Sequence, residues 1–117
     1  MLMNEIQINR QKNFPLFQRV EGSTFYSLLG RASKKMRGIS FNYDHKSKII
    51  ETIIFFDSTL SEQEKEEMEI ANTEVLADIH YEVTDFLLTL EITPSSEAIL
   101  DKCGNWGWIY LRREYDF

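Results

Sequence analysis

The clearest periodic pattern in this 117-residue chain is SEQEKEEMEIANTEVLAD, residues 61–78. Ser61 and Glu64 have the spacing of a capping box, in which each side chain can satisfy a free backbone N–H at a helix start. Acidic residues in the first turn also suit the helix dipole. At about 100° per residue, a mostly apolar stripe then follows one helix face. Its members are Met68, Ala71, Asn72, Val75, Leu76 and Ile79. The pattern predicts a helix from about Ser61 to about Asp78.

Strand patterns lie on both sides of this helix. Residues 39–43 alternate between apolar and polar, and residues 48–56 are rich in β-branched and aromatic side chains. Because a polar turn at 44–47 joins the two runs, they predict a β-hairpin. After the helix, residues 86–92 predict a long strand that ends before Pro94, and residues 106–112 predict a last strand.

The first part of the chain is expected to hold one strand and one helix. Residues 2–9 alternate between isoleucine and polar side chains, which is typical of a half-buried strand. The segment 10–22 is irregular, since Pro15 excludes a central strand there, and it has room for a turn of helix. Residues 24–36 predict a helix with one apolar stripe. Gly38 follows at a position where a glycine often terminates a helix. The stripe consists of Phe25, Leu28, Leu29, Ala32 and Met36.

The order of these elements predicts an α+β fold in a single domain over residues 1–117. We expect a two-layer domain in which a mostly antiparallel sheet of four or five strands carries two helices on one face. The full order is β-α-β-β-α-β-β. Its first six elements match the order of ferredoxin-like folds.

Composition restricts the class of protein. With 43% hydrophobic and 27% charged residues, the chain has the make-up of a compact globular domain. It has neither a run of about 20 apolar residues, which would span a bilayer, nor a basic-then-apolar start typical of an export signal. A single cysteine, Cys103, fits a reducing compartment, so we expect a cytoplasmic protein without membrane partners.

Charges are segregated along the chain. Residues 1–48 hold nine basic and three acidic side chains, whereas residues 49–111 hold two basic and fourteen acidic ones. The total is −6. An acidic surface of this kind either keeps the domain in solution or steers it toward a basic partner, because charge complementarity raises association rates.

The sequence offers no set of residues for catalysis, metal binding or cofactor binding. The nitrogen and sulfur donors are His45, His80 and Cys103, and none lies at a metal-ligand spacing. No glycine-rich loop for phosphates precedes a helix. Carboxylates such as Glu62 and Glu66 would have to share a cleft to work as acid and base. We therefore expect a protein that is not an enzyme, with no cofactor.

RNA binding is an alternative that rests on one short motif. The run RGISF, residues 37–41, is similar to an RNA-recognition strand, and Lys34 and Lys35 precede it. Isoleucine replaces the expected aromatic residue, and an acidic protein repels phosphates. Nucleic acid is therefore not the partner that we expect.

Two surfaces are candidates for protein binding. The first is the acidic side of the 61–78 helix, where Ile70 lies among charges. Ile70 is an ordinary exposed residue, a packed one or an anchor for a partner. The second is the last strand, in which Trp106, Trp108, Tyr110 and Arg112 share one face by alternation. These aromatic residues form either the core or a binding surface.

The chain resembles the small immunity proteins of bacterial toxin–immunity systems, including those of contact-dependent inhibition. The likeness lies in GISFNYD at residues 38–44, FFDSTLSEQEKEEME at 55–69 and WGWIYLRREYDF from residue 106. It implies a non-catalytic cytosolic protein that binds a cognate toxin domain, often a basic nuclease, and blocks its active site or substrate path. It assigns no functional residue.

Our hypothesis combines the resemblance with the charges, since carboxylates can occupy the place of phosphates against the lysines and arginines of a nuclease. The expected partner-binding residues are Asp57, Glu62, Glu66, Glu67, Glu69, Ile70, Glu74, Trp106, Trp108 and Tyr110. We expect a monomer rather than a homodimer. The competing hypotheses are a structural or regulatory adaptor that self-associates through its last strand, and a small enzyme that uses Cys103 and His80.

Overall fold

A computed structural model of the protein describes residues 2–114, with the side chains from residue 5 onward. The elements follow one another as α1 (Leu2–Lys12), α2 (Phe14–Ser27), β1 (Met36–Asp44), β2 (Ile49–Phe56), α3 (Glu62–Ile79), β3 (Asp85–Ile92), the short 3-10 helix η1 (Leu100–Lys102) and β4 (Trp108–Leu111). The fold is α+β, as the sequence predicts. The strands form one mixed sheet in the order β3-β2-β1-β4.

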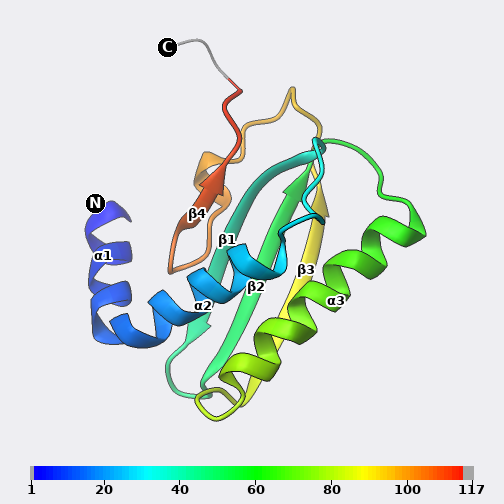
Figure 1. Cartoon of the computed structure of the whole chain (residues 1–117). Coiled ribbons are helices and arrows are strands. Elements are labelled where there is room, and N and C mark those ends of the chain that lie inside the picture. The colour runs from blue at the N-terminus through cyan, green and yellow to red at the C-terminus, as the bar shows by residue number, and fades with distance from the viewer. Residues whose placement is uncertain (1, 115–117) are drawn as a thin grey trace.

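The sheet is built from one hairpin and two longer connections. β1 and β2 pair antiparallel, as do β1 and β4, whereas β2 and β3 are parallel. Helix α3 is the crossover between the parallel strands, and it lies with α2 across one face of the sheet (Figure 1). Helix α1 lies at the opposite side of the molecule, beside β4 (Figure 1).

Three predicted elements are confirmed by the structure. The hairpin forms β1 and β2, and the strand predicted at 86–92 is β3. The predicted acidic helix is α3, and its capping box is present. The backbone N–H of Glu64 donates to Ser61 Oγ at 3.1 Å, and the N–H of Ser61 donates to the Glu64 carboxylate at 2.8 Å.

The strand predicted over residues 2–9 is wrong, because this segment is helix α1. Ile6 and Arg10, one helical turn apart, both meet the chain around Gly107. Ile6 is buried there, and Arg10 donates to the carbonyls of Trp106 and Trp108 at 2.6 and 2.8 Å. Contacts with residues that are distant in sequence thus select the helix, and a short alternating pattern does not reveal them.

The helix predicted over 24–36 begins and ends too late. Helix α2 covers Phe14–Ser27, and Pro15 lies in its first turn. Proline fits there because the backbone N–H groups of the first turn have no partner within the helix, so the missing N–H of proline costs no helical hydrogen bond. The buried side runs from Leu16 and Phe17 through Val20 to Thr24. Residues 28–35 form turns and an irregular connection, and Met36 starts β1.

The element order and the last strand also need correction. The observed order α-α-β-β-α-β-β differs from the expected β-α-β-β-α-β-β and does not give a ferredoxin-like start. Trp106 lies before β4 and is 1% exposed in the core between α2 and the sheet, 4.7 Å from the Tyr43 ring. Trp108 packs against Phe55, whose neighbours Ile54 and Phe56 face the helices, so it lies on the opposite sheet face. The expected aromatic row is therefore divided between two faces.

Candidate partner-binding surface

Helix α3 presents different carboxylates to its two sides. Toward α2, Glu67 and Glu74 both bind Arg31, at 2.9 and 2.6 Å. The hydrogen bond that Arg31 donates to Glu74 is the main cause that raises the pKa of the Arg31 guanidinium. Because Arg31 follows α2 in the chain, this pair of carboxylates joins α3 to the connection between α2 and β1.

Two further carboxylates, one of them a predicted partner residue, also bind cations of this chain. Glu64 lies 2.9 Å from Lys35, and its pKa is lowered first by the Ser61 backbone N–H and then by Lys35. The predicted residue Asp57 binds Arg112 at 2.8 Å, and this contact is the main cause that lowers the pKa of Asp57. Asp57 thus joins the end of β2 to the segment after β4. Such internal ion pairs are less available to a partner than unpaired carboxylates.

Three carboxylates remain on the other side of α3. At about 100° per residue, Glu62, Glu66 and Glu69 lie on the side turned away from Arg31. All three are exposed, and among the described residues only Glu62 has an ion pair, a 3.4 Å contact with Lys65 one turn along. Ile70, 40% exposed, lies one helical turn after Glu66 on the outer surface. We call this group, Glu62, Glu66, Glu69 and Ile70, the acidic face of α3.

The predicted aromatic residues do not join the acidic face. Trp106 is buried, Trp108 is half-buried, and its ring N–H donates to the Leu100 carbonyl at 3.2 Å. Tyr110 lies on β4 and is 36% exposed. Because β4 and β3 are the two edges of the sheet, Tyr110 is remote from the acidic face.

Sequence reasoning missed the buried role of Arg37. Its side chain is fully buried and binds Glu114 through two contacts of 2.6 and 2.8 Å. It also donates to the carbonyls of Thr93 and Pro94. The RNA-recognition hypothesis loses its basis here, because Arg37 is internal and Phe41 is 0% exposed, so neither can meet a nucleic acid.

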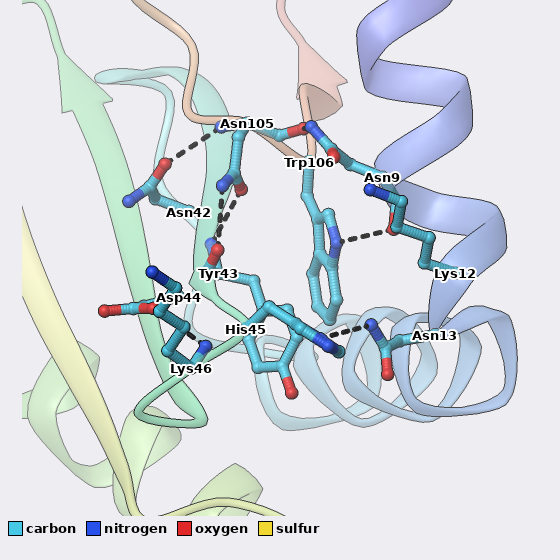
Figure 2. A pocket seen from close by; sticks show the side chains of 10 residues that line it. All are labelled: Asn9, Lys12, Asn13, Asn42, Tyr43, Asp44, His45, Lys46, Asn105 and Trp106. Atoms are coloured by element: carbon cyan, nitrogen blue, oxygen red, sulfur yellow. Dashed lines mark hydrogen bonds between the residues drawn. The ribbon is translucent and has the colours of Figure 1, made fainter.

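A hollow lies between α1 and the β1–β2 turn (Figure 2). Its volume is about 490 Å³. Asn105 donates to the Tyr43 carbonyl at 2.7 Å and accepts from the Tyr43 N–H at 2.8 Å, and Trp106 donates to the Asn9 carbonyl at 3.3 Å. These bonds hold α1 and the loop before β4 against β1. The polar lining therefore has a structural role, and no sequence motif marks it.

The structure does not assemble an enzyme site from the residues named for one. His80 contacts the Ala77 carbonyl and the Tyr81 ring at the end of α3, and Cys103 is half-buried in the loop before β4. Over the described residues, no group of three or more His, Cys, Asp and Glu side chains could hold a metal ion. Within the same residues, no helix combines the length and apolar character needed to cross a bilayer.

Comparison with known families gives one match. The model of a family described as MafI2 immunity protein matches residues 18–114, which is most of the chain. The matched part begins within α2 and includes the whole sheet, α3 and the Arg37–Glu114 ion pair. No curated protein matches the sequence.

Proposed function

Because the chain belongs to the MafI2 immunity protein family, we propose that it binds a cognate bacterial toxin domain in the cytoplasm and neutralises it. It acts by occupying the toxin's active site or substrate path and not by catalysis. The observation that supports binding by charge is the acidic face of α3, where three exposed carboxylates lie to one side of an exposed isoleucine. Charged groups beside an apolar anchor are common in protein interfaces.

We further propose that the toxin is a basic nuclease. Nuclease sites that hold phosphates present lysine and arginine side chains, and carboxylates form charge-assisted hydrogen bonds with the same groups. Glu62, Glu66 and Glu69 can supply these bonds without giving up the ion pairs that hold α3 to Arg31 and Lys35. Glu64, Glu67, Glu74 and Asp57 have a mainly structural role in this proposal.

The self-associating adaptor has weaker support. Its expected contact, the last strand, is only four residues long as β4. The register of β4 against β1 shifts between Ile39 and Ser40, and such irregularities protect a sheet edge against pairing.

The proposal is tested by purifying the tagged protein from its native host at low and then high salt and identifying what co-elutes. We expect a basic toxin domain in stoichiometric amount that is released as salt rises, since screening weakens exposed charge contacts. Cells that express this toxin should survive only with the immunity protein present. A toxin that binds equally well at both salt concentrations would contradict the electrostatic mechanism.

A triple charge reversal then tests the acidic face. Glu62→Lys, Glu66→Lys and Glu69→Lys together should slow association with the toxin and abolish protection. The matched control reverses three exposed carboxylates elsewhere, at Glu5, Glu97 and Asp101, and so gives the same net charge. Equal protection by both variants would show that the acidic face is only a solvated surface.

A further inference from the structure

Strand β3 forms an open edge of the sheet. Among the described residues its only strand neighbour is β2, and Figure 1 shows it at the margin of the sheet beside α3. The strand is eight residues long and contains no proline, lysine or arginine. These are the residues that usually prevent an edge from pairing with another strand.

The hydrogen bonds of Phe86 show which residues point to the open side. Its N–H donates to the Asp85 side chain at 2.8 Å, and its carbonyl accepts from Asn72 at 3.0 Å, so neither group serves β2. In a strand, alternate residues direct their backbone groups to the same side. Leu88 and Leu90 therefore turn their N–H and C=O groups to the open edge.

Carboxylates flank this edge on both sheet faces. On the helix side, the hydrogen bond from Asn72 to Phe86 shows which side of α3 faces β3. At about 100° per residue, Glu62, Glu66 and Glu69 lie next to that side of the helix and away from Arg31. On the other face, Asp85 and Glu91 lie on β3 with Leu87, which is 45% exposed, between them. Glu51 of β2 adds a further carboxylate there, in contact with Thr89.

We propose that the β3 edge accepts an extended basic segment of the toxin by β-strand addition. The inference rests on the proposed function and extends it from the acidic face to the neighbouring backbone. An antiparallel segment would place its first and seventh residues opposite Glu91 and Asp85, where lysine or arginine fits. Its fifth residue lies opposite Leu87, where an apolar side chain fits.

Charge also argues against a second copy of this chain as the occupant. In an antiparallel pair of β3 strands centred on Leu88, Asp85 of each chain lies opposite Glu91 of the other. Like charges directly opposite each other destabilise strand pairing. Backbone hydrogen bonds then give affinity to a basic partner, and side chains at alternate positions give specificity.

The test is amide hydrogen exchange of the protein alone and in complex with the co-purified toxin. We expect the N–H groups of Leu88 and Leu90 to exchange at least about tenfold more slowly in the complex, because each would gain a backbone acceptor. A stable complex in which these two amides are unchanged overturns the inference and leaves the inhibitor role standing. If no toxin binds, both the proposed inhibitor role and the inferred strand addition fail. Protection of the amides in a dimer without toxin would identify a second copy as the occupant and would also overturn it.

A peptide gives an independent readout of the edge. The probe is Lys-Thr-Val-Thr-Val-Thr-Lys, and binding is followed by the amide shifts of Leu88 and Leu90. N-methylation at peptide residues 2 and 4 removes donors that face β3 and should abolish these shifts. N-methylation at residues 3 and 5 removes donors that face away and is the matched control. Equal binding of the two methylated peptides would contradict strand addition.

Charge variants of the protein complete the test. Glu69→Lys with Glu91→Lys should weaken peptide and toxin binding about tenfold, because each change replaces attraction by repulsion. Glu5→Lys with Glu97→Lys makes the same charge change away from β3 and should change binding less than about twofold. Binding that both variants weaken equally would mean that net charge, and not this edge, attracts the partner.

Discussion

Arg37 places a charged side chain in the interior of the protein. It lies on β1, is fully buried, and has its charge balanced by Glu114, which is 14% exposed in its side chain. Glu114 also binds Arg112 at 2.9 Å, and Arg112 binds Asp57. These four residues join β1, the end of β2 and the segment after β4 into one ionic network. A buried cation of this kind is costly to leave without its carboxylate.

Removal of the Glu114 carboxylate should therefore destabilise the fold strongly. We expect Glu114→Ala to lower the free energy of unfolding by about 3 kcal/mol, the lower end for a broken buried pair, because Arg37 keeps two carbonyl acceptors. Urea denaturation measures the change. Glu97→Ala, which removes only an exposed contact of 4.0 Å with Lys102, should stay within about 0.5 kcal/mol of the parent. Similar losses for the two variants would contradict the role of the network.

The same network predicts how stability depends on pH. Arg37 is the main cause that lowers the pKa of Glu114, and Arg112 the main cause that lowers the pKa of Asp57. A carboxyl group whose pKa is lower in the folded state stabilises the fold above its unfolded-state pKa. This stabilisation is lost as the pH falls through the folded-state pKa. The melting temperature should hold from pH 7 to about pH 5 and fall below about pH 4. In the Asp57→Asn, Glu114→Gln variant the decrease should be smaller, and an equal decrease would assign acid sensitivity to other groups.

At the scale of elements, the sequence predicts best where the local pattern and the tertiary contacts agree. Helix α3 has both a capping box and an apolar stripe, and the hairpin has alternation and a polar turn, so both are found within a few residues of their predicted bounds. Helix α1 is different, because its polar sequence is fixed by Ile6 and Arg10 against a loop almost 100 residues away. In the candidate site, the sequence identifies the acidic helix. It does not separate Glu66 and Glu69 from Glu67 and Glu74, since the position of Arg31 decides between them.

Gly107 controls how α1 meets the sheet. Its φ is +75°, and an added Cβ would lie 2.9 Å from Ile6 Cγ2. We expect Gly107→Ala to destabilise the protein by about 2 kcal/mol through backbone strain and displacement of α1. The matched control is Gly22→Ala in α2, where nothing lies within 4 Å, and it should stabilise by about 0.5–1 kcal/mol. Thermal unfolding of both variants tests this, and stabilisation by both would contradict the role of Gly107.

At the scale of the molecule, the segregated charges largely meet one another. Arg31 and Lys35 come from the basic first part of the chain and bind α3, and Arg19 of α2 binds Glu82 just after α3. The segregation seen in the sequence therefore also serves internal contacts, because these cations join α2 and the connection after it to α3 and the turn that follows α3. Among the described carboxylates that make no ion pair, Glu66 and Glu69 lie on the acidic face, and Asp85 and Glu91 lie on β3.

This distribution predicts a monomer. Two copies that met through their β3 edges would bring their excess carboxylates together, and like charges oppose such pairing. Light scattering coupled to gel filtration should give a mass near 13.8 kDa at low salt. A dimer at low salt would contradict the prediction and favour an adaptor that self-associates.

The order of the elements along the chain determines which parts of the sheet exist first during synthesis. Residues 36–92 supply β1, β2, α3 and β3, so three adjacent strands and their crossover helix are complete before β4 is made. Domains tend to fold as their chain emerges, and the hairpin is the most local pairing here. Residues 108–114 then add β4 to the far edge of β1 and bring Glu114 to Arg37. The nascent chain therefore carries the acidic face and the open edge before Glu114 reaches Arg37, and the addition of β4 completes the sheet.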